Sequence, residues 1–265
     1  MASPEYDAAE LLAHALRTSR ASLALVQDIT HEQAGLFDEL VHRRELREPL
    51  QHITGTAAFR YVEVAVGPGV FVPRPETELL AGWGIDRARA VQACGRPPVV
   101  VDLCTGSGAM ALAFHDEVPD AAIHAVELDP QAYEWATRNL VGTDVDLRRG
   151  DMADAFPDLS GNVDVIVCNP PYIPLEAFES VAVEARDFDP SLALWSGADG
   201  LDAMRVLEVV GTRLLRRDGV LGAEHADAQA DSAQGIFTAS GRWSAVRDHQ
   251  DLAGRSRFLT ARLAR

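Results

Sequence analysis

From residue 99 onward, short apolar runs alternate with amphipathic stretches along the chain. The runs that begin at Val99, at Ala121 and at Val163 predict buried β-strands, because each run is short and almost continuously apolar. Strands that alternate with helical stretches are typical of a mostly parallel sheet with helices on both faces. In such a sheet we expect a ligand site at the carboxyl ends of the strands.

The last third of the chain predicts one further helix and the end of the sheet. Residues 199–217 form an amphipathic stretch that Gly219 would end, and residues 220–224 predict the next strand. Residues 243–247 and 258–263 suit a terminal hairpin. These segments complete the predicted sheet.

The first fifty residues predict a small helical unit. Ser3 and Pro4 begin one helix, and Thr30 with Gln33 has the capping-box spacing at the start of a second. Each helix is predicted to carry an apolar stripe, formed by Ala8, Leu11, Leu12 and Ala15 in the first and by Leu36, Phe37, Leu40 and Val41 in the second. The unit is too small for an extensive core, so we expect it to pack on the main domain or on a partner. At its end we expect a solvated basic face, formed by Arg43, Arg44 and Arg47.

Alternating apolar positions from Phe59 to Val72, with glycines among them, predict a hairpin that leads into the rest of the chain. Helix signals resume at Glu76. We therefore expect an N-terminal helical domain over residues 1–50, a hairpin linker over 51–75 and the main domain over 76–265.

A glycine-rich turn follows the strand that begins at Val99. Residues 104–108 of this turn lead directly into a helical stretch, as in a nucleotide-binding βα turn. The glycines allow close approach of the backbone to a ligand, and the helix N-terminus offers unpaired N–H groups. Glu127, near the end of the next strand, is placed to bind both hydroxyls of a ribose. Asp129 then caps a helix that begins at Pro130.

The tetrapeptide Asn169-Pro170-Pro171-Tyr172 directly follows the third apolar run. The asparagine side chain offers a carbonyl acceptor, and the proline fixes the backbone so that its own carbonyl can point into the same space. Two acceptors can hold both hydrogens of one planar NH2 group, while the tyrosine ring lies against the group that carries it. Acceptors that strengthen as positive charge develops on nitrogen stabilise the transition state, which indicates N-methylation.

Residues 106–111 also fit the G-x-G-x-x-G/A fingerprint of dinucleotide enzymes, and Glu127 read alone fits a solvated carboxylate at a strand end. The glycine fingerprint is a weak signal by itself. The pairing with Asn169 favours a methyltransferase, since a nicotinamide enzyme has no use for a clamp on an NH2 group.

The composition limits the partners of this 265-residue chain. Its formal net charge of −16 works against direct binding of nucleic acid, because affinity for duplex DNA comes largely from Lys and Arg at phosphates. We expect a protein partner, no membrane segment and a cytoplasmic location. Cys94, Cys104 and Cys168 lack CxxC spacing and the eight histidines are scattered, so we expect no metal.

Several strings in a fixed order make the chain resemble the bacterial peptide chain release factor N5-glutamine methyltransferases, the HemK or PrmC family. Besides the two motifs above, the resemblance rests on five further strings and covers nearly the whole chain: Pro49 to Gly55, Gly69 to Glu78, Asp187 to Pro190, Gly197 to Asp202 and Asp251 to Arg255.

The resemblance implies a class I S-adenosylmethionine-dependent methyltransferase fold over residues 76–265. This fold is doubly wound, with a mostly parallel seven-stranded sheet that has a terminal antiparallel strand, and a small N-terminal helical domain for partner recognition precedes it. The implied cofactor is S-adenosyl-L-methionine. The implied substrate is the glutamine of the Gly-Gly-Gln motif in release factors, methylated at N5 of its side-chain amide.

The resemblance also implies roles for individual residues. Asn169, Pro170 and Tyr172 would be catalytic, and Phe71 to Thr77 would cover the site. The cofactor would be bound by Cys104, Thr105, Gly106, Ser107, Gly108, Glu127, Asp151, Met152 and Asn169. The substrate would be bound by Phe71, Asn169, Pro170, Pro171 and Tyr172.

Two positions depart from the family pattern. Cys104 stands where glycine is frequent, so this position either does not need a positive φ or is modestly strained. Residues 224–227 read Glu-His-Ala-Asp where a glycine-containing Glu-Ile-Gly string is expected, so their contacts are not predicted. Three other functions stay open: a glutamine methyltransferase of a ribosomal protein, an adenine-N6 DNA methyltransferase and a non-catalytic cofactor-binding protein.

Overall fold

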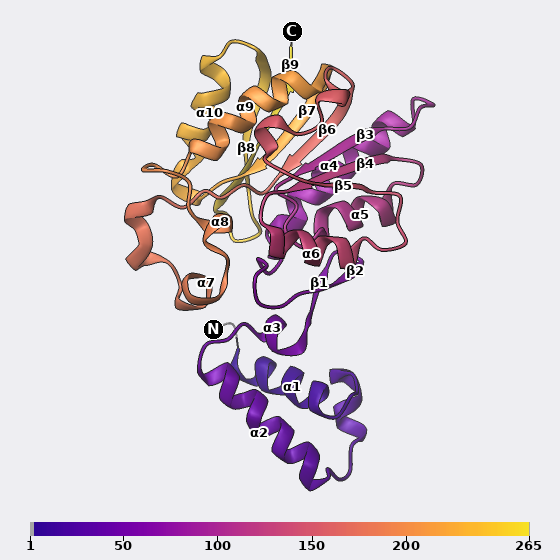
Figure 1. Cartoon of the computed structure of the whole chain (residues 1–265), viewed down its shortest axis with the longest axis vertical. Coiled ribbons are helices and arrows are strands. Elements are labelled where there is room, and N and C mark those ends of the chain that lie inside the picture. Colours follow the sequence, from indigo (N-terminus) through magenta and orange to yellow (C-terminus); the bar gives the residue numbers. More distant parts are fainter. Residues whose placement is uncertain (1–2, 265) are drawn as a thin grey trace.

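The computed structural model describes residues 3–264; residues 1, 2 and 265, at the outer limits of the predicted domains, lie outside the described residues. Figure 1 shows a large twisted sheet flanked by helices, with a small group of helices at one end of the molecule. Within residues 3–264, seven strands form the large sheet in the order β5-β4-β3-β6-β7-β9-β8. Their bounds are β3 (Val99–Leu103), β4 (Ala122–Glu127), β5 (Asp146–Arg149), β6 (Val163–Cys168), β7 (Leu215–Glu224), β8 (Trp243–Gln250) and β9 (Ser256–Leu263).

The strand directions agree with the expected fold. Strands β3, β4, β5, β6 and β7 pair in parallel, and β9 runs antiparallel to both of its neighbours, β7 and β8. The class I methyltransferase fold, with its terminal antiparallel strand, is therefore confirmed. The predicted strands at Val99, Ala121 and Val163 and the terminal hairpin are all present.

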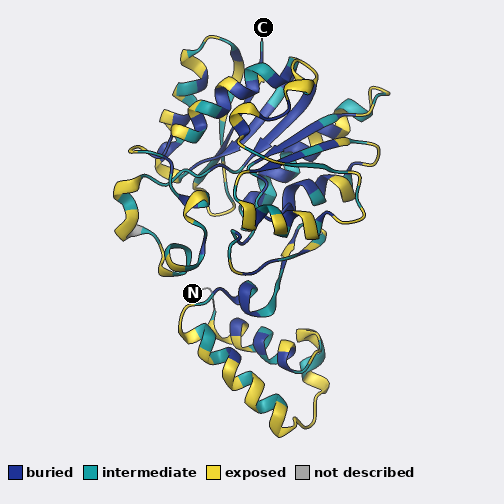
Figure 2. Cartoon of the chain, in the orientation of Figure 1, coloured by how far each residue is buried: buried dark blue, intermediate teal, exposed yellow. Residues whose placement is uncertain are grey.

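Helices cover both faces of the sheet, and the central strands β3 and β6 are almost entirely buried (Figure 2). Alternate residues of one strand enter two separate cores: Val165 and Val167 pack with helices on one face, and Ile166 packs with those on the other. One face is covered by α4 (Thr77–Gln92), α5 (Ala109–Glu117) and α6 (Pro130–Asn139), and the other by α9 (Asp202–Leu214) and α10 (Ala230–Ala239).

The boundary between α9 and β7 differs from the sequence-based expectation. The predicted helix over residues 199–217 begins at Asp202 and ends at Leu214, and the strand begins at Leu215 rather than at Val220. Leu215 leaves the helix because it pairs with Val163 in the sheet, where it is buried. The pairing then shifts register before Val165, so Gly219 lies within an irregular strand rather than at a helix end.

Between Tyr172 and α9 the chain makes a long excursion, which we call the flap (residues 173–200). It contains the short helices η4 (Leu175–Ser180), α7 (Val183–Phe188) and α8 (Ser191–Leu194). In Figure 1 this segment lies to one side of the sheet and reaches toward the N-terminal helices. The other 3-10 helices are η1 (Arg20–Leu25), η2 (Met152–Asp154), η3 (Pro157–Leu159) and η5 (Asp227–Gln229) in the part of the chain that the structure describes.

The N-terminal helices begin where the sequence indicates. Ser3 caps α1 (Pro4–Ala15), and Thr30 forms a full capping box with Gln33 at the start of α2 (His31–Glu45). The predicted apolar stripe of α1 is only partly right. Leu11 and Ala15 are buried, but Ala8 is exposed and the acidic Asp7 is buried in its place. The packed face is rotated because the Asp7 carboxylate accepts a hydrogen bond from the Arg44 guanidinium at 2.8 Å.

The prediction of a solvated basic face was wrong for Arg44. Its side chain is only 11% exposed, and it forms ion pairs with Asp7 of α1 and, at 3.0 Å, with Glu184 of the flap. Arg47 also lies 3.8 Å from Glu184 but is largely exposed, and Arg43 pairs with Glu48. Arg44 therefore connects the N-terminal helices to the flap, a contact between residues too distant in sequence for the helix pattern to indicate.

A short helix and a hairpin join the two parts of the molecule. In α3 (Leu50–Thr54), Leu50 and Ile53 pack against the N-terminal helices. The hairpin of β1 (Thr56–Phe59) and β2 (Val62–Ala65) packs instead in the main core through Phe59 and Val64. The domain limits at residues 50 and 75 stay predictions.

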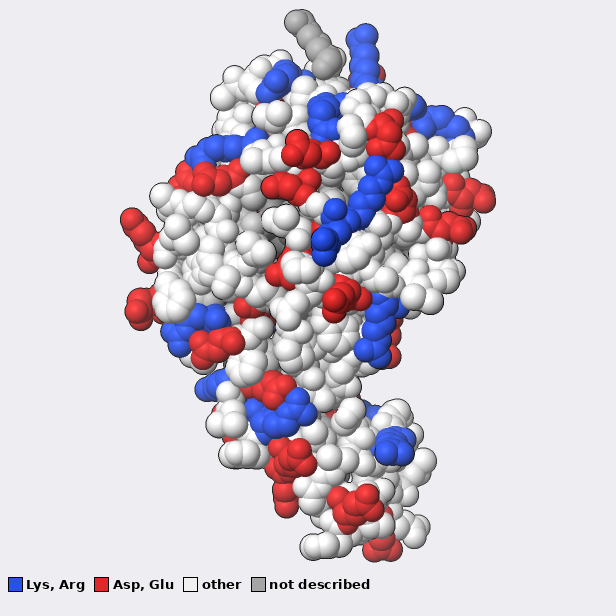
Figure 3. Space-filling view, in the orientation of Figure 1, with Lys and Arg blue, Asp and Glu red and all other residues white. Residues whose placement is uncertain are grey.

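Acidic and basic side chains are interspersed on the face drawn in Figure 3, over the N-terminal helices as well as the main domain. Across residues 3–264, no helix is both long enough and apolar enough to cross a membrane.

Candidate active site

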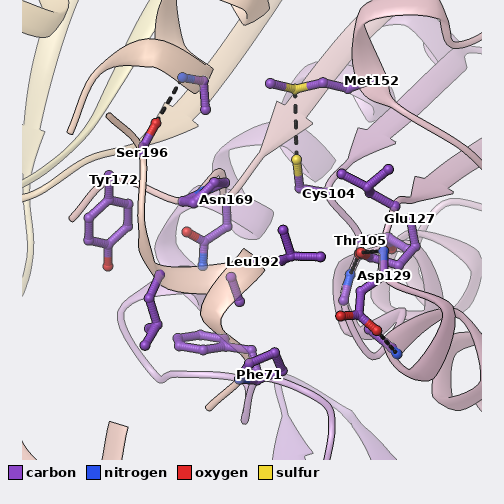
Figure 4. A pocket seen from close by; sticks show the side chains of 18 of the residues that line it. Phe71, Cys104, Thr105, Glu127, Asp129, Met152, Asn169, Tyr172, Leu192 and Ser196 are labelled. Carbon is purple, nitrogen blue, oxygen red and sulfur yellow. Dashed lines mark hydrogen bonds between the residues drawn. The ribbon is translucent and has the colours of Figure 1, made fainter. Parts of the chain in front are cut away.

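A cavity of about 590 Å³ opens at the carboxyl ends of β3, β4 and β6 (Figure 4). Eleven of the predicted site residues line it: Phe71, Cys104, Thr105, Gly106, Ser107, Glu127, Asp151, Met152, Asn169, Pro171 and Tyr172. Gly108 and Pro170 are not among its lining residues. In Figure 4, Asn169 and Tyr172 lie on one side of the cavity and Thr105, Glu127 and Asp129 on the other.

The glycine turn takes left-handed backbone conformations at three positions. Cys104, Gly106 and Gly108 have φ values of 60°, 59° and 83°. Cys104 therefore adopts the strained conformation, the second of the two alternatives that the sequence left open. Gly108 caps α5, where an added Cβ would lie 3.3 Å from the Leu140 side chain, so it shapes the turn from behind rather than facing the cavity.

A buried hydrogen bond holds the glycine turn on its strand. Thr105 donates its hydroxyl hydrogen to Asp102 Oδ2 at 2.5 Å, and Thr105 N donates to the Val126 carbonyl of the neighbouring strand at 3.0 Å. Burial raises the pKa of Asp102 to about 7, and the hydrogen bond from Thr105 opposes that rise. The turn is thus fixed to two strands at once.

Glu127 lies at the end of β4, with 9% of its surface exposed. Its Oε2 accepts a hydrogen bond from Gly106 N and its Oε1 from Asp129 N, both at 2.8 Å. Burial raises the pKa of Glu127, while these backbone donors oppose the rise. Each carboxylate oxygen has lone pairs for a further bond, so the side chain can still accept ligand hydroxyls while it ties the glycine turn to the start of α6.

Two sulfur atoms lie close together on the cavity wall between the side with Asn169 and the side with Glu127. The Cys104 thiol lies 3.7 Å from Met152 Sδ, a contact drawn as a dashed line in Figure 4. Met152 begins η2, which Asp151 caps by accepting a hydrogen bond from Ala153 N at 2.9 Å. The result is a polarizable surface beside a capped turn, which suits contact with an aromatic ring.

The Asn169 side chain follows β6 and lies beside the threonine that begins α4. Asn169 Nδ2 donates to Thr77 Oγ1 at 3.4 Å, and the Thr77 hydroxyl donates to Glu224 Oε2 at 2.7 Å. The Tyr172 hydroxyl donates to Glu224 Oε1 at 3.1 Å. Burial, together with the nearby Glu224 carboxylate, raises the pKa of Tyr172 well above its usual range.

Sequence reasoning did not find Glu224, and it named Thr77 only as the end of the covering segment. The signal for Glu224 was present as a departure from the family pattern at residues 224–227, but nothing near it in the sequence indicates its partners. Those partners lie 52 and 147 residues away, at Tyr172 and Thr77.

The cavity is covered by Phe71 and Arg74 on one side and by the flap on the other. Arg74 lies over the Phe71 ring, 4.8 Å from its centroid, and pairs with Asp189 of the flap at 2.8 Å. Burial raises the pKa of Asp189 to about 6, and the Arg74 charge opposes that rise. The flap contributes further lining residues, among them Leu192, Trp195 and Ser196.

One glycine lets the flap approach the Asn-Pro-Pro-Tyr turn. Gly200 has a φ of 76°, and an added Cβ would lie 2.3 Å from the Tyr172 carbonyl oxygen. Gln229 donates hydrogen bonds to the carbonyls of both Tyr172 and Asp199. The end of the flap and the turn are therefore held together without room for a side chain at residue 200.

Comparisons with known proteins agree with this geometry. Residues 1–55 match the PrmC N-terminal domain family, and residues 91–185 match the methyltransferase small domain family. A release factor glutamine methyltransferase of Streptomyces coelicolor is 55% identical, over 99% of this chain and 92% of the relative. One from Mycolicibacterium smegmatis is 43% identical, over 100% and 93%. A 4-amino-L-phenylalanine/4-methylamino-L-phenylalanine methyltransferase of Streptomyces pristinaespiralis is 44% identical, over 78% and 71%.

Solved structures share the fold. A methyltransferase from Pyrococcus furiosus aligns with a TM-score of 0.54 at 17% identity, covering 84% of this chain and 97% of that one. A ribosomal protein L11 methylase from Lactobacillus delbrueckii subsp. bulgaricus aligns with a TM-score of 0.50 at 20% identity, covering 74% and 82%.

The sheet order, the glycine turn with its strand-end carboxylate and these alignments define a class I S-adenosyl-L-methionine-dependent methyltransferase. Identity over the full length then narrows the class. The chain belongs to the release factor glutamine methyltransferase family.

The residues of the cavity fit the cofactor of this class. Its volume is in the range of small-molecule sites, which is a few hundred to about 1,000 Å³. A buried carboxylate, Glu127, lies beside a turn whose left-handed residues bring the backbone to the cavity wall. Carboxylate acceptors for ribose hydroxyls and a close backbone are what S-adenosyl-L-methionine requires.

Proposed function

We propose that this protein transfers a methyl group from S-adenosyl-L-methionine to N5 of the glutamine in the Gly-Gly-Gln motif of peptide chain release factors. One observation carries the proposal: a single cavity is lined both by the glycine turn with Glu127 and by Asn169 and Tyr172. A cofactor pocket and a clamp for an NH2 group thus share one space. The similarity of the whole chain to release factor glutamine methyltransferases supports the choice of substrate.

In this proposal the residues of one side hold the cofactor. Glu127 accepts hydrogen bonds from ribose hydroxyls, and Asp151 and Met152 flank the adenine. The methionine end lies against the glycine turn at Cys104, Thr105, Gly106 and Ser107, and Gly108 shapes this turn from behind. When bound, the cofactor supplies an electrophilic methyl group carried by a sulfonium.

The residues of the other side hold the glutamine. Asn169 Oδ1 accepts one amide hydrogen, and the other is assigned to the backbone carbonyl of Pro170, a residue that does not itself line the cavity. Tyr172, Pro171 and Phe71 contact the flat faces of the amide. An amide nitrogen is a poor nucleophile because its lone pair is conjugated. Two fixed acceptors help most when positive charge develops on that nitrogen, so they lower the barrier rather than only tighten binding. No residue need act as a strong base, because the methylated nitrogen loses a proton readily.

The N-terminal helices recognise the partner in this proposal, and the reaction takes place in the cytoplasm, where release factors act in translation termination. The match of residues 1–55 to the PrmC N-terminal domain family supports that role. A small-molecule amine substrate is disfavoured because the amino-phenylalanine methyltransferase relative matches 78% of this chain, whereas the release factor glutamine methyltransferases match 99% and 100% of it.

A labelled-methyl assay tests the proposal. Purified enzyme and radiolabelled S-adenosyl-L-methionine are incubated with one acceptor at a time. The acceptors are release factor, release factor whose Gly-Gly-Gln glutamine is replaced by alanine, ribosomal proteins, duplex DNA and 4-amino-L-phenylalanine. We expect label in the intact release factor alone. Label in ribosomal proteins or DNA but not in the release factor would overturn the substrate assignment, and no label in any acceptor would overturn the activity.

A further inference from the structure

The hydroxyl group of Thr77 lies between two polar side chains of the candidate site. Its oxygen is 2.7 Å from Glu224 Oε2 and 3.4 Å from Asn169 Nδ2. The three residues come from the start of α4, the end of β7 and the turn after β6. Thr77 and Glu224 are 5% and 2% exposed, so water competes little for the hydrogen bond between them.

The directions of these hydrogen bonds follow from what each group can donate. The Thr77 hydroxyl donates to Glu224 Oε2, and a hydroxyl group has only one hydrogen to donate. Toward Asn169 the Thr77 oxygen can then only accept. Asn169 must therefore turn its NH2 group to Thr77, and its carbonyl oxygen is the atom left for the cavity.

The Tyr172 hydroxyl points at the second oxygen of the same carboxylate, at 3.1 Å. Glu224 therefore orients both side chains of the Asn-Pro-Pro-Tyr turn, one directly and one through Thr77. Burial disfavours its charge and raises its pKa, but the two hydroxyl donors and the nearby Arg257 favour the ionised form.

We infer that Thr77 and Glu224 are positioning residues that fix the amide orientation of Asn169, so that Oδ1 rather than Nδ2 faces the substrate nitrogen. The inference rests on the proposed methyl transfer to an amide, because only an NH2 substrate needs an acceptor at this point. With the amide inverted, two NH2 groups would face each other, and the clamp would repel its substrate.

The first test separates orientation from folding by using two substitutions of one residue. Thr77→Val keeps the shape of the side chain but removes the hydroxyl, whereas Thr77→Ser keeps the hydroxyl. We expect Thr77→Val to lower kcat with release factor about tenfold, the size of one lost preorganising hydrogen bond, and to leave the cofactor Kd within about twofold. Thr77→Ser should stay within about threefold of the wild-type kcat.

Glu224→Gln and a distant threonine complete the set. The glutamine amide can accept from the Thr77 hydroxyl, as the carboxylate does, or donate to it and free its hydrogen to point at Asn169, so kcat should lie between the wild-type and Thr77→Val values. Thr260→Val is the matched control, because Thr260 is also buried and also hydrogen-bonded through its hydroxyl, at 2.9 Å to His249, but does not line the cavity. Its kcat should be unchanged.

A spectroscopic readout does not depend on activity. The chain has only three asparagines, Asn139, Asn162 and Asn169, so selective 15N labelling of asparagine side chains gives three NH2 signals. In Thr77→Val we expect the Asn169 signal to shift and to exchange faster with water. The Asn139 signal should not move, since its NH2 group donates to the carbonyls of Ala65 and Ser107.

The outcomes distinguish this inference from the proposed function. Wild-type kcat in Thr77→Val, or an equal loss in Thr77→Val and Thr77→Ser, would overturn the orienting role and leave the function intact. An unshifted Asn169 signal in Thr77→Val would overturn it as well. A wild-type enzyme that methylates no release factor would instead overturn the proposed function.

Discussion

The two sides of the cavity are built in different ways. On the cofactor side, the backbone supplies most of the structure: Glu127 accepts from Gly106 N and Asp129 N, which lie within 21 residues of it in sequence. On the substrate side, side chains supply most of the structure. Thr77 orients Asn169, which is 92 residues away in sequence, and Glu224 orients Thr77, which is 147 residues away. The first side therefore depends mainly on the backbone of one turn and on Glu127, whereas the second depends on several hydroxyl and carboxyl groups that are distant in sequence.

The largest expected effect comes from a substitution that acts mainly on the substrate side. Asn169→Ala removes one of the two acceptors for the amide, and we expect kcat to fall by about two to three orders of magnitude, as when one preorganised electrostatic group is lost. The cofactor Kd should rise by no more than about threefold, because the glycine turn and Glu127 remain and only the contact predicted between Asn169 and the cofactor is lost. Steady-state kinetics with release factor and calorimetry with cofactor measure the two effects. Full activity with an intact fold would show that the clamp assignment is wrong, and Asn162→Ala, at an exposed position, is the control.

The next effect breaks the cofactor side. Glu127→Ala removes the carboxylate and its bonds to Gly106 N and Asp129 N, so we expect the cofactor Kd to rise about tenfold or more, the size of lost charge-assisted hydrogen bonds. Calorimetry of cofactor binding checks this. Glu134→Ala, an exposed glutamate on α6, should bind the cofactor like the wild type. Unchanged affinity in Glu127→Ala would remove that residue from the site.

A smaller effect concerns the flap, through the pH dependence of stability. Asp189 is buried, and its pKa rises from 3.8 in the unfolded chain to about 6 in the folded protein. The folded protein therefore binds the Asp189 proton more tightly than the unfolded chain does. The stability that this proton gives is fully present below pH 3.8 and is lost as the pH rises through about 6. Relative to Asp189→Asn, we expect the wild-type free energy of unfolding to fall by about 1 kcal/mol from about pH 5.5 to about pH 7.5. Urea unfolding of both proteins measures the difference. Asp187→Asn, which is exposed, should show no such trend, and a rise instead of a fall would contradict the assignment.

The smallest expected effect is a change in protein stability when Cys104 of the glycine turn is replaced by glycine. Cys104 has a φ of 60°, so Cys104→Gly relieves strain but adds chain entropy to the unfolded state. We expect a net stabilisation of about 0.5 kcal/mol, measured by urea unfolding. Cys94→Gly, at an exposed cysteine without a positive φ, should not stabilise the protein. A greater loss of stability in Cys104→Gly than in Cys94→Gly would show that packing of the thiol against Met152 outweighs the strain.

The sequence predicts the cofactor side better than the substrate side for a physical reason. Glu127, Asp129 and Pro130 act on groups a few residues away or on the adjacent strand, so their spacing carries the information. The signal for Asn169 is likewise local, because it directly follows a strand that is buried along its whole length. Glu224 has no local signal, because its function is defined by hydroxyl groups that only the fold brings to it.

The errors in the predicted fold have the same origin. Leu214 and Leu215 are both buried, so apolar periodicity cannot show that one ends α9 and the other begins β7; pairing of Leu215 with Val163 decides it. In α1, Asp7 is buried where an apolar stripe would exclude it, because Arg44 of another helix neutralises it. In each case a partner distant in sequence overrides a local pattern.

The hairpin of β1 and β2 has a practical consequence for anyone who expresses the catalytic part by itself. Phe59 is 1% exposed, packs in the main core and also lines the cavity, and Arg60 beside it pairs with Glu117 at the end of α5. A shortened clone that starts at Glu76 would therefore lack a wall of its own binding site. Truncation trials should start upstream of Thr56, and poor yield from shorter versions would reflect a missing piece of the interior rather than an unstable enzyme.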